Sequence, residues 1–267
     1  EMCIRDRARM EPKRLESTHL AEGVSKTGRL GEVPMMRALW AIEAFARDAA
    51  ERGVPVYAYA TSAVRDSENR ADFCQRAAAL GVQIQVLEPA EEARLALLGA
   101  TGGQGGLLDI GGGSTEILRP GFLHSAPLGC VKARELCDSA YSLEEMKRRV
   151  FAKCKELFRF PPEKSEDYVG VGGTITTVAA LMLGLKAYDG AKVAAMPICH
   201  TALDELVEWL YDLGSAGRAA QPLLKGREHT ILPGALILVY LMKHMGLGEL
   251  RVSDRDGMEG FLLDVLG

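Results

Sequence analysis

The 267-residue sequence predicts an α/β protein, and two observations lead to that class. Short runs rich in apolar and β-branched residues alternate with longer segments whose apolar residues recur every three or four positions. Such an alternation of strands and helices is typical of a largely parallel or mixed sheet flanked by helices. In addition, two buried-type strands each run directly into a turn rich in glycine. A chain of this length can form two domains of ordinary size.

The first hundred residues alternate regularly between the two kinds of segment. Pro34 begins a helix whose apolar face carries Met35 and Leu39, and Gly53 ends it. The segments that follow are expected to be a strand (54–60), a helix (68–80), a strand (82–87) and a helix (89–98). The stretch TGGQGG (101–106) is expected to be a loop near the boundary between two domains, residues 1–100 and 101–256.

The rest of the chain is richer in strands at first and in helices later. Strands are predicted at 107–110, 115–118, 122–126, 168–171 and 249–253. Helices are predicted at 143–158, 174–183, 201–213, 233–245 and 257–266. The most apolar stretch, 231–242, contains Pro233 and Gly234 and is too short to span a bilayer, so it is expected to be a buried core helix.

Composition and charge exclude several classes of protein. The formal net charge is -4 and the pI is about 5.8, which argues against broad binding of nucleic acid, although a local basic pocket for a polyanion remains compatible with it. Six cysteines without a CxxC pair indicate reduced thiols in a cytoplasmic protein rather than disulfides or a metal site. No signal peptide and no membrane span are expected.

The segment DIGGGSTE, residues 109–116, follows an apolar strand and holds three consecutive glycines. Glycine permits positive φ and leaves backbone N–H groups open to an oxyanion, while Ser114 adds a hydroxyl donor. Carboxylates beside a phosphate loop usually bind a hard cation, so Asp109 and Glu116 are candidate ligands for Mg²⁺. The alternative is an ordinary hairpin, but such a turn does not need three glycines. The predicted phosphate-binding residues here are Gly111, Gly112, Gly113 and Ser114.

A second glycine turn lies in VGVGGTITT, where a strand changes into a helix at Gly172 and Gly173. The free N–H groups and positive dipole of the helix start, together with Thr174, are expected to bind an anion. Tight packing of strand against helix explains the glycines equally well when the motif is taken alone. Taken with DIGGGSTE, the turn is expected to form the facing half of one cleft.

Two segments place charged side chains at the ends of elements. Arg65 follows a strand at the end where open α/β sheets bind ligands, and its guanidinium suits bidentate contact with phosphate. A solvated arginine at a helix start is the alternative. Glu91 and Glu92 lie in the first turn of a helix, where the dipole already favours carboxylates, so spacing alone does not decide whether either is a catalytic base.

Seven segments, in order and covering the chain from about residue 20 to its end, resemble the exopolyphosphatase and guanosine pentaphosphatase (Ppx/GppA) family. They are ATSAVRDSEN, EEARL, DIGGGSTE, SAPLGCVKARE, GVGGTITTVAAL, GREHTILPGALIL and VSDRDGMEG. The resemblance implies an actin-like ATPase (ribonuclease H-like) fold of two related domains, with the active site in the cleft between them. It also implies that the last helix, 257–267, packs back on the first domain.

The activity implied by the resemblance is hydrolysis of a terminal phosphoanhydride of inorganic polyphosphate or pppGpp, with Mg²⁺ or a similar divalent cation. By motif, Glu92 would orient and deprotonate the attacking water, Asp109 and Glu116 would bind metal, and Arg65 would clamp phosphate. Phosphoryl transfer requires mainly positioning and neutralisation of charge, which these groups supply.

The sequence departs from the family at its start. Members begin with a strand, a DIGSNS-type phosphate turn and another strand, none of which occurs in this sequence. Residues 1–10 are therefore expected to be extraneous, the first domain to be incomplete and the activity to be impaired. A kinase of the same superfamily that uses ATP, or a non-catalytic sensor of polyphosphate or guanosine polyphosphate, stays an alternative. The sequence also leaves open whether the protein forms a homodimer.

Overall fold

The computed structural model describes residues 14, 16, 18–160, 167–194 and 196–266. The expectation for residues 1–10 therefore lies outside the described residues. The chain divides into two compact units, unit 1 up to Pro89 and unit 2 from Ala90 onward. Each unit is described by itself below. The domain boundary predicted at residue 100 and the return of the last helix to the first domain stay predictions.

Unit 1 is built on two short parallel strands, β1 (Ala58–Ala60) and β2 (Ile84–Val86). Its helices are α1 (Val24–Thr27), α2 (Glu32–Glu51), α3 (Ser62–Arg65) and α4 (Arg70–Ala79). Met35 and Leu39 of α2 pack with Phe73 of α4 in a small buried cluster. The strand predicted from residue 54 begins only at Ala58, because the residues ahead of it are exposed to solvent and pair with no strand among the described residues.

Unit 2 contains, among the described residues, a six-stranded sheet with the order β5-β4-β3-β6-β8-β7. Its strands are β3 (Gly106–Ile110), β4 (Thr115–Arg119), β5 (Phe122–Ala126), β6 (Tyr168–Val171), β7 (Ile198–Cys199) and β8 (Glu249–Val252). The main helices are α5 (Pro89–Thr101), α6 (Cys130–Cys137), α7 (Leu143–Leu157), α8 (Gly172–Met182), α10 (His200–Asp212), α12 (Ile231–Met245) and α13 (Gly257–Leu266). Shorter helices are α9 (Gly190–Ala194), α11 (Gly214–Ala219) and the 3₁₀ turn η2 (Pro222–Leu224). The sheet is mixed, as predicted: β3, β6 and β8 run parallel, and the outer strands run antiparallel.

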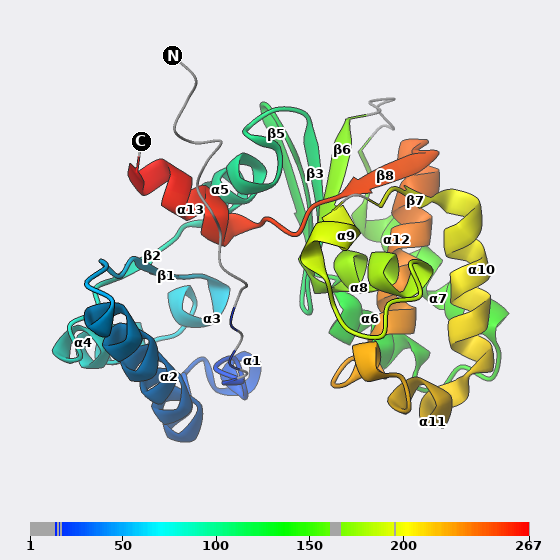
Figure 1. Cartoon of the computed structure of the whole chain (residues 1–267). Helices are drawn as coiled ribbons and strands as arrows, with labels where there is room; N and C mark the ends of the chain where they lie inside the picture. The colour runs from blue at the N-terminus through cyan, green and yellow to red at the C-terminus, as the bar shows by residue number, and fades with distance from the viewer. Residues whose placement is uncertain (1–13, 15, 17, 161–166, 195, 267) are drawn as a thin grey trace, which may run out of the picture. The chain divides into compact units, whose positions relative to one another are not determined.

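The two faces of this sheet are covered by different helices. Figure 1 shows α5 on one side and α8, α10 and α12 on the other. Leu107 and Val171 pack beneath α5, whereas Leu108 and Ile110 face the larger core. Since side chains alternate along a strand, Asp109 lies on the same face as Leu107, toward α5.

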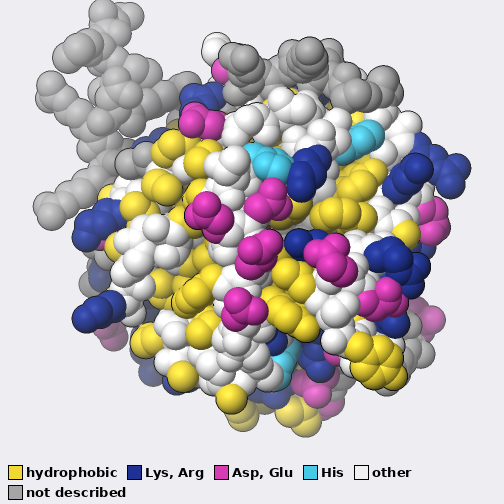
Figure 2. All heavy atoms as spheres, turned by 90° about the vertical axis from the view of Figure 1, so that its right-hand side faces the viewer, with side chains coloured by type: hydrophobic (Ala, Val, Ile, Leu, Met, Phe, Trp, Pro, Cys, Tyr) yellow, Lys and Arg dark blue, Asp and Glu magenta, His cyan; other side chains and the backbone are white. Residues whose placement is uncertain are grey.

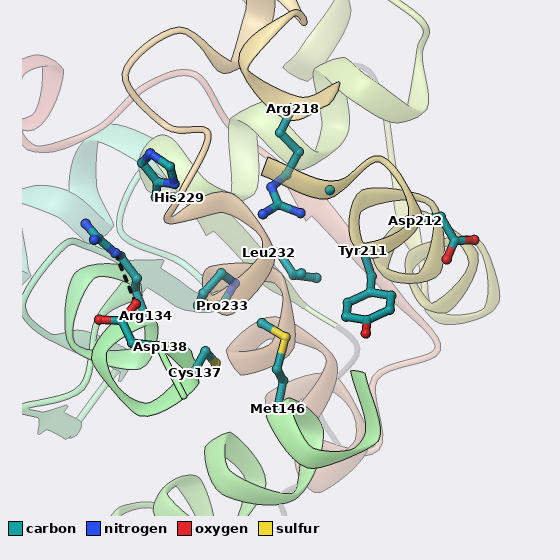
Figure 3. A pocket seen from close by; sticks show the side chains of 11 residues that line it. Arg134, Cys137, Asp138, Met146, Tyr211, Asp212, Arg218, His229, Leu232 and Pro233 are labelled. Atoms are coloured by element: carbon teal, nitrogen blue, oxygen red, sulfur yellow. Dashed lines mark ion pairs between the residues drawn. The ribbon is translucent and has the colours of Figure 1, made fainter. Parts of the chain in front are cut away.

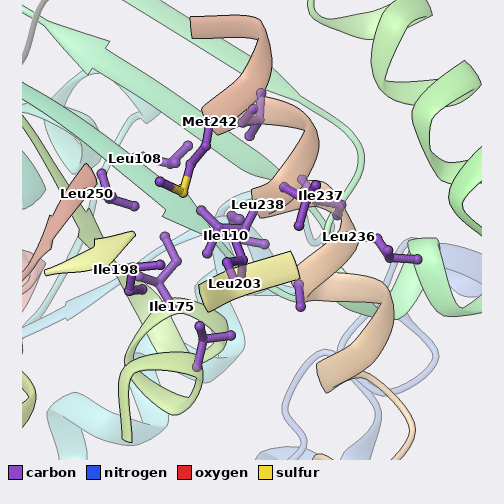
Figure 4. Packing of buried hydrophobic residues seen from close by; sticks show 14 of the residues in the cluster. Leu108, Ile110, Ile175, Ile198, Leu203, Leu236, Ile237, Leu238, Met242 and Leu250 are labelled. Carbon is purple, nitrogen blue, oxygen red and sulfur yellow. The ribbon is translucent and has the colours of Figure 1, made fainter. Parts of the chain in front are cut away.

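The larger core of unit 2 is centred on α12, which is buried along almost its whole length. Figure 4 shows Ile237, Leu238 and Met242 of this helix among side chains from the strands and from α8 and α10. The prediction of a buried core helix here is confirmed. No helix among the described residues is long and apolar enough to cross a bilayer. The cysteines that the structure describes are free thiols.

Three α-helices of unit 2 were not predicted: α6, α9 and α11. The segment after β5 was left without a helix, yet Cys130 to Cys137 form α6. Its first N–H groups, those of Cys130 and Val131, donate to the carbonyl oxygens of Gly111 and Gly112, each at 2.9 Å. This tertiary contact at the helix start stabilises a helix whose own sequence is short and only weakly amphipathic.

Helices α5 and α13 cross at two glycines, Gly99 and Gly260. A Cβ atom at Gly260 would collide with the carbonyl oxygen of Leu95, and one at Gly99 with the carbonyl oxygen of Asp256. Both obstacles are backbone atoms, which cannot turn aside as a flexible side chain can. The crossing therefore requires glycine on both helices.

We expect Gly260→Ala to lower the free energy of unfolding by about 2 kcal/mol or more, because the helices must separate to admit a methyl group. For unit 2 this corresponds to a fall in Tm of roughly 5 °C. Gly248→Ala is the matched control, since a Cβ atom there meets nothing within 4 Å. Thermal unfolding followed by circular dichroism measures both variants. Equal Tm values for the two would contradict the close crossing.

Candidate functional site

The two glycine turns lie next to each other at one edge of the unit 2 sheet. Strands β3 and β6 are parallel neighbours, with Asp109 in register with Val171. The turn 111–114 follows β3 and the turn at Gly172 follows β6, so both occupy the carboxyl ends of adjacent strands. This is the edge at which open α/β sheets bind ligands. The expectation that the two turns face each other as halves of one cleft was wrong, because they sit side by side on one sheet.

The first turn is a four-residue hairpin loop that closes the register pair Ile110 and Thr115. The N–H of Gly111 donates to the Ser114 carbonyl at 3.0 Å. Positive φ was expected at residues 111–113, but none of these glycines has it. A Cβ atom at Gly111, Gly112 or Gly113 would meet at most an ordinary van der Waals contact. The position that requires glycine is Gly129 at the start of α6, where a Cβ atom would collide with the backbone of Gly111 and Gly112.

Asp109 and Glu116 face each other across β3 and β4, in direct register. Like charges opposite each other in a sheet are unfavourable unless something neutralises them. Burial, together with the negative charges of Glu116, Asp256 and Glu92, raises the pKa of Asp109 to about 7. Glu116 also accepts a hydrogen bond from the Ser125 hydroxyl at 2.9 Å. A neighbourhood with this excess of negative charge favours a bound cation.

Mg²⁺ fits the Asp109–Glu116 pair. Among the described residues, no three Asp, Glu, His or Cys side chains converge as a full ligand cage. Mg²⁺ does not need one, because it commonly keeps several waters and is bound by one or two carboxylates together with substrate phosphate oxygens. The carboxylate pair, with open glycine loops beside it, matches that pattern.

The structure separates the two glutamates at the start of α5. Glu91 accepts from the Arg94 guanidinium at 2.9 and 3.1 Å, and this contact lowers the pKa of Glu91. Arg94 also pairs with Asp264 of α13 at 2.8 Å, so Glu91 belongs to a surface ion-pair network. Glu92 instead lies close enough to Asp109 to raise the pKa of that carboxyl.

Asp256 is a carboxylate near Asp109 that reasoning from the sequence missed. It lies ahead of α13, where its side chain accepts from the Met258 N–H at 2.8 Å and its own N–H donates to Glu259 at 2.8 Å. Its negative charge raises the pKa of Asp109. The only signal in the sequence was the segment VSDRDGMEG, which contributed to the family resemblance but was assigned no role.

The second glycine turn lies directly against the Asp109 carboxylate and the Arg227 guanidinium. Gly172 has φ +85°, and a Cβ atom there would collide with Oδ1 of Asp109. A Cβ atom at Gly173 would collide with the guanidinium of Arg227. Thr174 is 3% exposed, and its side chain packs against Gly234 of α12. The N–H groups at the start of α8 are thus the part of this turn best suited to an anion.

Arg227 is the second residue that the sequence did not single out. Its guanidinium covers Gly173. Its positive charge acts to lower the pKa of Tyr188, whose hydroxyl donates a hydrogen bond to Asp254. Burial and that hydrogen bond raise the pKa of Tyr188, so the phenol stays neutral. The arginine of GREHTILPGALIL was the available signal. An arginine over an amide-lined turn is well suited to phosphate.

Arg65 belongs to unit 1, and its phosphate-binding role stays a prediction. Its Nη1 donates to the Leu87 carbonyl at 2.9 Å and its Nε to Asp66 at 3.2 Å. The side chain is only 13% exposed. These contacts position the guanidinium at the end of the β1–β2 sheet.

The outer face of unit 2 formed by α10 has a different character. Figure 2 shows acidic and basic side chains interspersed there, with a group of acidic ones near the middle. α10 contributes the acidic residues Asp204, Glu205, Glu208 and Asp212. This face is poorly suited to a long polyanion, in contrast to the amide-lined edge at the glycine turns.

Several proteins of known family or known structure are similar to this chain. Residues 12–267 match the Ppx/GppA phosphatase family. Exopolyphosphatase 2 of Mycobacterium tuberculosis is 32% identical over 279 residues, which cover 93% of this chain and 86% of the relative. The crystal structure of the Aquifex aeolicus Ppx/GppA family member is similar with a TM-score of 0.79 at 27% identity, covering 93% of this chain and 86% of that one. An exopolyphosphatase-like protein gives a TM-score of 0.82 at 26% identity, covering 96% and 91%. The predicted α/β, actin-like ATPase fold is confirmed.

Proposed function

Because this chain belongs to the Ppx/GppA phosphatase family, we propose that it removes the terminal phosphate from inorganic polyphosphate by metal-assisted attack of water. The observation that carries the proposal is the placement of Asp109. This carboxylate lies opposite Glu116, abuts Gly172 and is surrounded by negative charge at the edge where both glycine turns end. In this proposal, the sites for the metal, for the substrate phosphate and for the attacking water lie within one region of unit 2.

Each residue has a distinct role in this proposal. The backbone N–H groups of Gly111, Gly112, Gly113 and Ser114, and those at Gly172, Gly173 and Thr174, bind the phosphate oxygens. Asp109 and Glu116 hold Mg²⁺, which when bound supplies neutralisation of charge on the terminal phosphate. Glu92 orients the attacking water and accepts its proton. Arg65 clamps a phosphate, as the family resemblance implies.

Two refinements follow from the same site. We propose pppGpp as a second substrate, because its terminal phosphoanhydride presents the same oxygens to the site. We also propose that the chain acts more slowly than one joined to a DIGSNS-type strand and turn, since no such turn occurs in this sequence to complete the phosphate clamp.

The proposal is tested by phosphate release from polyphosphate by the full chain with Mg²⁺, with enzyme in excess so that slow turnover is detected. Release into water is expected. Phosphate transferred from ATP to an added sugar or carboxylic acid, without release, would instead indicate the kinase. Tight binding of polyphosphate with no release would indicate the sensor.

We expect Arg227→Met to raise KM for polyphosphate by about tenfold with a smaller effect on kcat, because an arginine that contacts phosphate in substrate and transition state contributes uniform binding. Arg251→Met is the control, since Arg251 is 65% exposed on β8 and pairs only loosely with Asp167, at 3.7 Å. Steady-state kinetics of the two variants measure the effect. An unchanged KM in Arg227→Met would remove this arginine from the substrate site.

A further inference from the structure

A cavity of about 560 Å³ lies among the helices of unit 2. It is lined by residues from α6, α7, α10, α11 and the first turn of α12, together with Asp138 and His229 (Figure 3). Its volume lies in the range that small organic ligands occupy in proteins. None of the residues assigned to the phosphate site lines it.

Two walls of this cavity continue into the candidate phosphate site. α6 lines the cavity with Arg134, and Asp138 follows directly after the helix. The first N–H groups of α6 donate to the carbonyl groups of the first glycine turn. The segment 227–233 lines the cavity with His229 and Leu232, and it carries Arg227, which covers Gly173. A molecule bound in the cavity would therefore contact both elements that support the two turns.

The side chains that face the cavity carry more positive than negative charge. Arg218 donates to the Leu210 carbonyl at 2.6 Å and to the Glu228 carbonyl at 2.8 Å. Among the described residues that line the cavity, the ion pairs involve Arg134 and His229 but not Arg218. Its burial lowers the pKa of the guanidinium, because the charge lacks full solvation. Figure 3 shows this guanidinium pointing toward Leu232, whereas the carboxylate of Asp212 points away.

The other charged groups around the cavity do not cancel the positive charge of Arg218. Arg134 is matched by Asp138 at 3.5 Å. His229 also lines the cavity, and its Nε2 atom lies 4.0 Å from the Glu228 carboxylate. Met146, Leu232 and Pro233 give the cavity an apolar wall. The combination of one unmatched guanidinium and an apolar wall suits a ligand with one anionic group and an apolar body.

We propose that this cavity binds a small organic anion, a carboxylate or a phosphate monoester, and that its occupancy acts on the phosphate site through α6 and the segment 227–233. The anionic group pairs with Arg218, and the apolar body lies against Met146 and Leu232. Binding does not depend on the proposed function, whereas the effector role rests on it.

The binding test uses the full chain labelled with ¹³C at the methionine methyl groups, with Met146→Leu to assign the cavity signal. 3-Phenylpropionate and phenyl phosphate represent the two kinds of anion, and 3-phenylpropanol is the neutral control. We expect the Met146 signal to shift saturably with an anion and at least tenfold more weakly with the alcohol, while the Met35 signal of unit 1 stays fixed. A fixed Met146 signal, or an equal response to the alcohol, would overturn the proposal.

Variants locate the anionic group. Arg218→Met should weaken anion binding at least tenfold, whereas Arg148→Met should not, because Arg148 is exposed and lies outside the cavity. If Arg218→Met does not fold, His229→Trp, which narrows the cavity from an exposed position, should also abolish the shift. Unweakened binding in whichever of these variants folds would overturn the assignment.

The effector role is read from phosphate release at saturating 3-phenylpropionate. We expect the ligand to change the rate of phosphate release at least twofold in the unmodified chain. The rate should stay constant in Arg218→Met, or in His229→Trp if Arg218→Met does not fold. A constant rate in both would overturn the effector role. If the chain releases no phosphate at all, that result contradicts the proposed hydrolysis, and the methionine signals still decide whether the cavity binds an anion.

Discussion

Replacing Glu92 by Gln is expected to lower the rate of phosphate release from polyphosphate by about 10²–10⁴-fold, the range typical for loss of a general base. Gln keeps the size of the side chain and can still orient a water, but it cannot accept the proton. Binding of polyphosphate should be retained, because the glycine turns and the Asp109–Glu116 pair are untouched. Single-turnover phosphate release and a separate binding titration measure the two effects.

The neighbouring glutamate provides the matched control. Glu91 lies in the same helical turn, but its carboxylate pairs with Arg94. Glu91→Gln should therefore change the rate of phosphate release less than about threefold, and it should lower the free energy of unfolding only by the small contribution of a surface ion pair. If both variants lose activity equally, the loss reflects damage to the start of α5 rather than a missing base. If Glu92→Gln keeps the full rate, the base must be sought elsewhere.

Replacing Asp109 by Asn should abolish the stabilisation of the protein by Mg²⁺ and make the metal-free protein more stable at neutral pH. Burial and three neighbouring carboxylates raise the pKa of Asp109 from 3.8 to about 7. A group with a raised pKa in the folded state contributes stability that is complete below about pH 4 and is lost as the pH rises to about 7. Asn has no such ionisation, so the variant keeps that stability.

The expected size of this effect follows from the shift. A difference of about three pKa units corresponds to about 4 kcal/mol at most, or a Tm difference of up to roughly 8–16 °C between Asp109→Asn and the unmodified chain above pH 7. The difference should shrink toward pH 4. Thermal unfolding between pH 4 and 8, with and without MgCl₂, measures it. Asp167→Asn, on the exposed surface, should behave like the unmodified chain.

Two outcomes of the same thermal unfolding measurements would contradict these expectations. If Asp109→Asn and the unmodified chain melt alike at pH 8 without metal, the carboxyl is better solvated than its surroundings indicate. If Mg²⁺ stabilises both proteins equally, the cation binds without Asp109, and the metal site must be reassigned.

Features encoded by local sequence were predicted well. The apolar run of α12 produced a buried helix, and the alternation of strands and helices produced a mixed sheet flanked by helices. Strand boundaries were less accurate in unit 1, where Val54 and Tyr57 have high strand propensity but are exposed. Helix α6 was missed because its stability comes from contact with the turn at Gly111 rather than from its own pattern.

The site was predictable only in part, for a physical reason. The glycine turns and the carboxylates beside them lie within short motifs, so spacing was enough to single them out. Asp256 and Arg227 come close to the site only through the packing of α13 on α5 and of the 227–233 segment on α8. Spacing alone did not separate Glu91 from Glu92, and the family resemblance favoured Glu92. The structure adds that Glu91 pairs with Arg94, which also pairs with Asp264.

The most direct test of hydrolysis at this site is the origin of the oxygen in the released phosphate. The full chain in excess over polyphosphate, with Mg²⁺ in ¹⁸O-labelled water, should release phosphate that carries one ¹⁸O from the attacking water. Glu92→Gln should form this product at least a hundredfold more slowly. Phosphate released without ¹⁸O, or labelled phosphate formed at the same rate by both proteins, would contradict the account.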